Sequence, residues 1–122
     1  TLKQIRKFDE VPDFRIIEPL GYFQMIQALT DCSLLITDSG GMQKEAYYAG
    51  KYCITLREET EWTELLDEGV NVLAGHSRDS ILDSVDAFLK ASPFAVKNIY
   101  GDGQAAHKIL ETLKNGILER SA

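Results

Sequence analysis

The sequence predicts an α/β fold built on a parallel, Rossmann-like sheet. Short β-branched or apolar runs alternate along the chain with amphipathic segments whose hydrophobic period is near 3.6 residues. That alternation is typical of repeated strand and helix units, in which consecutive strands lie parallel. Gly50 and Gly69 also stand where helices of such units end, because glycine readily adopts the left-handed conformation found at a helix C-terminus.

Strands are expected at four apolar or β-branched runs. They are residues 15–17, 33–37, 52–56 and 71–74. With right-handed helical crossovers, these strands form part of a doubly wound sheet, which normally has about six strands. The chain also does not begin with methionine, and we expect it to be a truncated part of a larger protein.

Helices are expected between and after these strands. They span residues 22–30, 41–48, 62–68, 80–90 and 104–118. The fourth helix presents one apolar stripe and ends before Pro93, because proline cannot continue a helix. An irregular turn at residues 100–103 precedes the last helix, whose lysines form a solvated face. We expect Asp102 of this turn to cap the helix rather than to act in catalysis.

The overall charge limits the class of partner. The chain has 122 residues, a formal net charge of -6 and 44% hydrophobic residues, which is ordinary for one core. Nucleic acids and anionic membrane surfaces are bound by basic patches, so neither is an expected partner. An anionic small ligand must be held by local donors against this field. With no apolar run of about 20 residues and no signal-peptide pattern, a cytoplasmic protein is expected.

The cysteines and histidines carry no predicted chemistry. Cys32 and Cys53 lie in apolar stretches without metal-ligand spacing, so we expect buried, reduced thiols. His76 and His107 are expected to be surface or packing residues rather than an acid or a base. The sequence indicates no metal site and no cofactor.

Residues 34–46 carry the strongest chemical signal, because they read as a strand, a tight turn of small residues and a helix. Gly40 and Gly41 let an anion approach the backbone, and the first free N–H groups of a helix favour negative charge. Ser39 adds a hydroxyl donor. Glu45 stands about 6 Å beyond Gly41 on the same helix face, where it can accept hydrogen bonds from ribose hydroxyls. Alternatively, Ser39 only caps the helix and Glu45 is a solvated acid; the spacing leaves both open.

Four segments in this order resemble one enzyme family. They are residues 18–22 (Glu-Pro-Leu-Gly-Tyr), 38–46 (Asp-Ser-Gly-Gly-Met-Gln-Lys-Glu-Ala), 56–61 (Leu-Arg-Glu-Glu-Thr-Glu) and 98–105 (Asn-Ile-Tyr-Gly-Asp-Gly-Gln-Ala). Together they resemble the non-hydrolysing UDP-N-acetylglucosamine 2-epimerases over nearly the whole chain. That family has the glycosyltransferase-B architecture, in which two Rossmann-like domains enclose the active site. The resemblance implies that residues 1–122 are a truncated C-terminal UDP-binding domain, without the N-terminal domain.

The same resemblance implies roles for individual residues. The implied UDP-binding residues are Ser39, Gly40 and Gly41 for the diphosphate, Glu45 for the ribose, and the segment from Leu20 to Met25 for uracil, largely through backbone atoms. The helix at 104–118 would close back toward the first domain. The full-length protein is expected to be a homodimer whose interface lies mainly in that domain.

Two residues of the loop after the third expected strand have alternative interpretations. Arg57 can reach a substrate phosphate, or it can pair with a neighbouring glutamate at 58, 59 or 61, and the structural ion pair is favoured. Many relatives have Glu-Arg-Pro in place of residues 61–63, and their arginine faces the substrate. Trp62 cannot donate the same charge-assisted hydrogen bonds. It either packs its helix onto the sheet or indicates the branch acting on UDP-2,3-diacetamido-glucuronate.

The implied reaction interconverts UDP-N-acetylglucosamine and UDP-N-acetylmannosamine. UDP leaves by anti-elimination and adds back, with the proton returned on the other face of carbon 2. Residues 39–41 would stabilise the departing diphosphate, whereas the carboxylates that move the proton lie in the family's first domain. We therefore expect this chain alone to lack turnover. The alternatives are a UDP-sugar glycosyltransferase or hydrolysing epimerase, which the ordered motifs disfavour, and a non-catalytic nucleotide-binding module.

Overall fold

The computed structural model describes residues 15–120, and the side-chain surroundings of residues 15–115. Its elements in chain order are α2 (Tyr22–Asp31), β1 (Leu35–Thr37), α3 (Gly40–Tyr48), β2 (Cys53–Thr55), α4 (Thr63–Asp67), β3 (Asn71–Leu73), α5 (Arg78–Lys90) and α6 (Ala105–Arg120). All five expected helices are present, each within two residues of its expected start and end. The strands at the second, third and fourth expected positions are also present, although each is shorter than expected.

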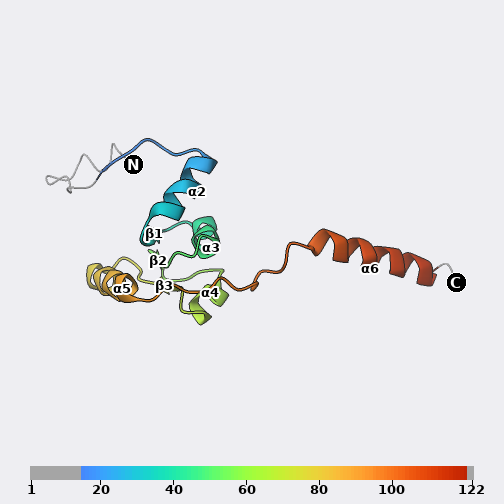
Figure 1. Cartoon of the computed structure of the whole chain (residues 1–122). Coiled ribbons are helices and arrows are strands. Elements are labelled where there is room, and N and C mark those ends of the chain that lie inside the picture. The colour runs from blue at the N-terminus through green and yellow to red at the C-terminus, as the bar shows by residue number, and fades with distance from the viewer. Residues whose placement is uncertain (1–14, 121–122) are drawn as a thin grey trace.

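The three strands form one parallel sheet in the order β1-β2-β3 (Figure 1). Leu35 is in register with Cys53, which is in register with Asn71. All three residues of the central strand β2 are buried, as expected for a parallel strand that is covered on both faces. The α/β fold class predicted from the alternation of patterns is therefore confirmed.

The expected first strand is wrong. Residues 15–17 belong to neither a strand nor a helix, and all three are exposed. The β-branched Ile16 and Ile17 favour an extended backbone, but a strand also needs a hydrogen-bonded neighbour. Within residues 15–120, the sheet has three strands, and this segment pairs with none of them.

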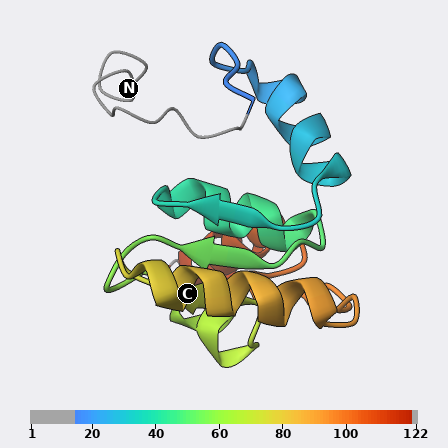
Figure 2. The same ribbon diagram turned by 90° about the vertical axis from the view of Figure 1, so that its left-hand side faces the viewer.

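Helices cover both faces of the sheet, with α3 and α4 on one face and α5 on the other (Figures 1 and 2). Two clusters of buried side chains hold the layers together: Leu29, Ala46 and Cys53 beside α2 and α3, and Tyr47, Leu65 and Val70 beside α4. The α5 helix contributes no fully buried residue, and Leu89 of its apolar stripe is 58% exposed. Its main anchor is Phe88, whose ring stacks on Tyr52 with 4.5 Å between centroids.

Two helices end in glycine, as expected. Gly50 after α3 and Gly69 after α4 have φ values of 69° and 67°. The Gly50 and Lys51 amides donate to the carbonyls of Tyr47 and Ala46, both at 2.9 Å. This pair of bonds is the Schellman motif, which satisfies the last carbonyls of a helix, and the same pattern follows α4. The turns therefore direct the chain from each helix into the next strand.

The last helix, α6, extends away from the sheet (Figure 1). Ile109, Leu110 and Leu113 lie on it with 60%, 49% and 58% of their surface exposed. Asp102 lies before the helix, and its Oδ1 accepts a 3.0 Å hydrogen bond from the Gln104 amide. Its carboxylate also pairs with Lys108 at 2.9 Å, and the Lys108 side chain is 65% exposed, as the expected solvated lysine face requires. No helix within residues 15–120 is long and apolar enough to cross a membrane.

Candidate ligand site at the carboxyl edge of the sheet

The turn from β1 into α3 lies at the carboxyl edge of the parallel sheet, where ligands of such folds bind. Ser39 is the N-cap residue of α3 and is exposed, and Gly40 and Gly41 form the first helical positions. The Ser39 amide donates a 3.1 Å hydrogen bond to the Thr37 hydroxyl. The next three N–H groups, of Gly40, Gly41 and Met42, precede the first possible intrahelical bond. Three donors and the positive end of the helix dipole therefore converge here.

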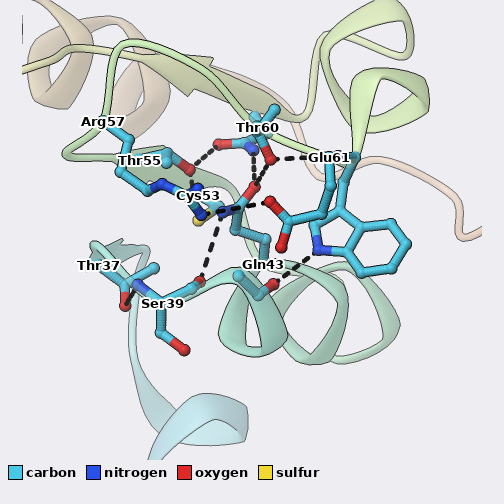
Figure 3. Close-up of polar contacts among 11 residues, drawn as sticks. Thr37, Ser39, Gln43, Cys53, Thr55, Arg57, Thr60 and Glu61 are labelled. Atoms are coloured by element: carbon cyan, nitrogen blue, oxygen red, sulfur yellow. Dashed lines mark hydrogen bonds and ion pairs between the residues drawn. The ribbon is translucent and has the colours of Figure 1, made fainter.

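The Ser39 hydroxyl makes no capping hydrogen bond with the helix. The alternative in which this side chain serves only as a helix cap is therefore wrong. Figure 3 shows the Ser39 side chain turned away from the polar contacts around Gln43. Its hydroxyl is thus placed as an additional donor on the solvent side of the helix start.

The two glycines differ in what surrounds them. A Cβ built on Gly40 would overlap Glu61 Oε1 and lie 3.7 Å from Arg57 Nη1, so a side chain there would displace the Glu61 carboxylate from its ion pair with Arg57. A Cβ built on Gly41 would meet no atom of the described residues within 4 Å. Glycine in a helix costs about 0.5–1 kcal/mol relative to alanine. Packing within the described chain therefore does not account for Gly41, and the space beside it is open.

Arg57 and Glu61 form an ion pair over this helix start. Arg57 Nη1 lies 3.2 Å from Glu61 Oε2, and the two side chains are 37% and 49% exposed (Figure 3). The favoured interpretation of Arg57 as one partner of a structural ion pair agrees with this geometry. Because the guanidinium is also close to Gly40, it lies beside the group of backbone donors.

Trp62 has a structural place in this loop. Its indole Nε1 donates a 2.9 Å hydrogen bond to the Gly40 carbonyl, and its ring packs edge-on against Tyr100. The Lys44 ammonium lies 3.9 Å from the Trp62 ring centroid and 4.0 Å from that of Tyr100, forming cation–π contacts with both. Burial, with a contribution from Glu64, raises the pKa of Tyr100 to about 12. Trp62 therefore joins α4, the start of α3 and the segment before α6.

Glu45 lies one turn beyond Gly41 and borders a cavity between α2 and α3. The cavity has a volume of about 300 Å³ and is lined by Tyr22, Ile26, Thr30, Glu45, Tyr48 and Ala49. The predicted ribose acceptor and the helix that starts in the predicted uracil segment thus share one hollow. Leu20 and Met25 are half-buried and do not line it. A second hollow, of about 310 Å³, lies at the amino ends of β1 and β2, away from this site.

A buried polar network lies directly behind the helix start and was not predicted. Gln43, Thr55 and Asn71 are 0%, 0% and 5% exposed. Gln43 Oε1 accepts hydrogen bonds from Thr60 Oγ1 at 2.7 Å and Asn71 Nδ2 at 2.9 Å, and Thr55 Oγ1 donates to Asn71 Oδ1 at 2.8 Å (Figure 3). The available signal was the threonine and asparagine inside apolar strands, since buried polar groups need partners.

The histidines are exposed, as expected, but each has a carboxylate neighbour. His76 Nδ1 lies 3.2 Å from Glu58 Oε1, and His107 Nε2 lies 3.4 Å from Glu111 Oε1. Of the cysteines, Cys53 is buried and Cys32 is only half-buried, so the expectation of two buried thiols is wrong for Cys32. Burial raises the pKa of the Cys53 thiol to about 11. Among the described residues, no cluster of histidine, cysteine and carboxylate side chains is arranged to hold a metal ion.

Comparison with known proteins decides the family. Residues 1–114 match the family model described as UDP-N-acetylglucosamine 2-epimerase. The chain belongs to this family. It is 45% identical over 101 residues to a UDP-2,3-diacetamido-2,3-dideoxy-D-glucuronate 2-epimerase of Pseudomonas aeruginosa, covering 83% of this chain and 28% of the relative. It is 34% identical over 118 residues to the UDP-N-acetylglucosamine 2-epimerase of Methanocaldococcus jannaschii, covering 94% of this chain and 32% of the relative.

Solved structures of this epimerase family share the fold. The M. jannaschii enzyme in complex with UDP-GlcNAc and UDP superimposes with a TM-score of 0.76 and 31% identity, over 93% of this chain and 30% of that one. The Neisseria meningitidis enzyme bound to UDP-GlcNAc gives a TM-score of 0.63 at 29% identity, over 81% and 28%. The predicted glycosyltransferase-B-type α/β class is confirmed. The chain spans about a third of the length of these relatives.

Proposed function

We propose that this chain forms the UDP-binding part of a UDP-sugar 2-epimerase, with the diphosphate held at the start of α3. The observation that carries the proposal is Gly41, a helical glycine with open space beside it and no packing neighbour in the described chain. A phosphate oxygen that approaches the backbone N–H groups closely would occupy that space. The family to which the chain belongs supplies the nature of the anion.

Neutral hydrogen-bond donors make the main contacts with the diphosphate. The hydroxyl of Ser39 and the amides of Gly40 and Gly41 are on the solvent side of the helix start, and the dipole adds about half a positive charge. Arg57 lies beside Gly40 but is paired with Glu61. We assign Arg57 primarily to ordering the loop, with contact to a phosphate as its secondary role. This arrangement lets an acidic chain of net charge -6 bind an anion.

The nucleoside lies in the cavity between α2 and α3. Glu45 accepts the ribose hydroxyls, because it borders this cavity one helical turn from Gly41. The uracil base lies toward the start of α2, where the backbone from Leu20 to Met25 provides the hydrogen bonds. The volume of about 300 Å³ is at the lower end of small-ligand pockets, which suits a nucleoside rather than the whole UDP-sugar.

The reaction then proceeds by elimination and re-addition of UDP. Charge develops on the leaving diphosphate as the bond to the sugar carbon breaks, and fixed donors at residues 39–41 stabilise that charge. The proton at carbon 2 is removed and returned by carboxylates outside this chain, in the part of the family's proteins that it does not match. The 122-residue chain alone therefore binds UDP weakly and does not epimerise UDP-sugars.

The sugar is the least determined part of the substrate. UDP-N-acetylglucosamine is the first candidate, because the matching family and several relatives have this activity in their names. The alternative is UDP-2,3-diacetamido-glucuronate, favoured by the 45% identity to the P. aeruginosa enzyme and by Trp62 in place of the family's substrate-facing arginine. Turnover of each sugar by the protein joined to its first domain distinguishes the two.

The last helix is the connection to the rest of the full-length protein. Ile109, Leu110 and Leu113 are exposed on α6, which extends away from the sheet, and an apolar helix face of this kind needs a partner surface (Figure 1). We propose that residues 104–118 close onto the first domain. The full-length protein is proposed to be a cytoplasmic homodimer, and the two free thiols of this chain suit a reducing compartment.

A ligand series tests the proposal with the chain as it exists. Amide NMR spectra are recorded during titration with UDP, uridine and inorganic phosphate. UDP is expected to shift the amides of Ser39, Gly40 and Gly41 as well as residues around Glu45, whereas uridine shifts only the second group. If UDP leaves residues 39–41 unchanged, the helix start is not the phosphate site. Detectable turnover of UDP-N-acetylglucosamine by the chain alone would contradict the proposal that the proton-transferring carboxylates lie outside it.

A further inference from the structure

We propose that Gln43, Thr60 and Trp62 are positioning residues that aim the backbone donors of the phosphate-binding turn, an inference that rests on the proposed function. The term brace refers here to these three side chains. Figure 3 shows Gln43 and Thr60 on the side of the turn away from the Ser39 hydroxyl, and Trp62 contacts the Gly40 carbonyl. The three residues belong to α3 and to the loop between β2 and α4.

The brace holds two carbonyls of the turn. Gln43 Nε2 donates to the Ser39 carbonyl at 3.4 Å, and Trp62 Nε1 donates to the Gly40 carbonyl at 2.9 Å. Thr60 joins the two donors, since its hydroxyl donates to Gln43 Oε1 at 2.7 Å and accepts from the Trp62 backbone amide at 3.2 Å. Gln43 is fully buried, so its partners are fixed by the protein rather than by water.

Peptide geometry turns these carbonyl contacts into control of the donors. In a planar trans peptide, the C=O of one residue and the N–H of the next point in opposite directions. The Ser39 carbonyl therefore sets the direction of the Gly40 N–H, and the Gly40 carbonyl sets that of the Gly41 N–H. Glycine has the greatest backbone freedom of any residue, so side-chain bonds to these two carbonyls, one from α3 itself and one from the loop before α4, limit that freedom.

The brace also explains the position of Trp62. Its indole N–H reaches the Gly40 carbonyl, its ring packs edge-on against Tyr100, and the Lys44 ammonium lies over its face. An indole N–H donates one directional hydrogen bond and bears no charge. Trp62 thus acts on the diphosphate through the backbone of the turn and not by contact with it.

Three variants of the 122-residue chain test the brace, each titrated with UDP and with uridine by amide NMR. Trp62→Phe keeps an aromatic ring and removes the N–H donor. Thr60→Val removes the hydroxyl that joins Gln43 to Trp62, and Thr60→Ser keeps it. Trp62→Phe and Thr60→Val are expected to weaken UDP binding by about fivefold or more, the effect of one lost hydrogen bond, and to leave uridine binding unchanged. Thr60→Ser is expected to bind UDP as tightly as the unmodified chain does.

The outcomes separate this inference from the proposed function. If the unmodified chain does not respond to UDP, the proposed function fails, and the brace fails with it. If the unmodified chain binds UDP and both disruptive variants bind it equally well, only the brace is wrong. Equal losses for UDP and uridine would show a general structural role and would also overturn the positioning role.

Discussion

Tyr47 of α3 makes a double hydrogen bond with the backbone of Lys97, fifty residues further along the chain. The Tyr47 hydroxyl donates to the Lys97 carbonyl at 2.9 Å and accepts from the Lys97 amide at 2.7 Å. Its ring also stacks on Phe94 with 5.8 Å between centroids. The segment that leads to α6 is therefore fastened to the helix whose start forms the candidate site.

Tyr47→Phe removes both hydrogen bonds and keeps the ring. We expect a loss of about 1 kcal/mol in the free energy of unfolding, because the two Lys97 backbone groups lose their partner. Denaturant unfolding measures the loss. Tyr48→Phe is the matched control, since Tyr48 is the next residue and is 54% exposed. Equal effects of the two variants would show that the hydroxyl contact does not stabilise the fold.

The two thiols are expected to differ in reactivity toward an alkylating reagent. The thiolate is the reactive form, and burial raises the pKa of Cys53 to about 11, so little thiolate forms there near neutral pH. Cys32 is half-buried and reacts first. Mass spectrometry of iodoacetamide-treated protein is expected to show Cys32 modified in the native state and Cys53 only after unfolding. Faster modification of Cys53 in native protein would contradict the burial of β2.

The turn before α6 is expected to loosen in acid. The Lys108 ammonium, and then the Gln104 amide, hold the pKa of Asp102 below its ordinary value of 3.8. Because the folded value lies below the unfolded one, the stabilising contact is complete above pH 3.8 and is lost as the pH falls through the lowered pKa. Carboxyl NMR titration is expected to show that Lys108→Gln raises the pKa of Asp102, whereas Lys114→Gln does not. If the pKa of Asp102 is unchanged in Lys108→Gln, this ion pair does not lower it.

Local patterns predicted most of the fold but could not supply contacts between distant segments. Helix periodicity and the glycines at 50 and 69 identified the helices and two of their ends, because these signals are local. Residues 15–17 show why: an apolar run before a helix predicts a strand, but strand formation depends on a partner elsewhere in the chain. The strands also end earlier than the apolar runs, since pairing and not hydropathy sets their length.

The sequence predicted the turn and the helix of the candidate site, but not the side-chain hydrogen bonds that hold the turn in place. Ser39 is the N-cap residue of α3, and Gly40, Gly41 and Glu45 lie on it, as their spacing predicted, while their contacts with a ligand stay predictions. The bond from Trp62 to Gly40 and the bonds of Gln43 to Thr60 and Asn71 cross 17 to 28 residues of sequence. The sequence shows the polar side chains but not which of them meet. The ion pair of Arg57 with Glu61 was among the expected interpretations because it spans four residues on one loop.

Glu45→Gln tests the ribose contact. The amide keeps the size of the side chain but is a weaker acceptor than a carboxylate, so UDP affinity is expected to fall by about threefold to tenfold. The affinity for 2′,3′-dideoxy-UDP, which lacks the ribose hydroxyls, is expected to stay the same. Amide NMR titration measures both, with Glu111→Gln on α6 as the control. Equal losses for the two ligands would show that Glu45 does not bind the ribose.

Gly41→Ala tests whether a diphosphate lies beside this glycine, because fold stability and UDP affinity are compared in the same variant. Since a Cβ at this position has no neighbour within 4 Å, alanine is expected to raise the stability of the fold, by at most the value of about 0.5–1 kcal/mol found in helix interiors. The same methyl group would occupy the space assigned to the diphosphate, so UDP affinity is expected to fall while uridine affinity is kept. Thermal unfolding and NMR titration of one sample give both values. Higher stability with undiminished UDP affinity would contradict the account, because the open space beside Gly41 would then have no phosphate in it.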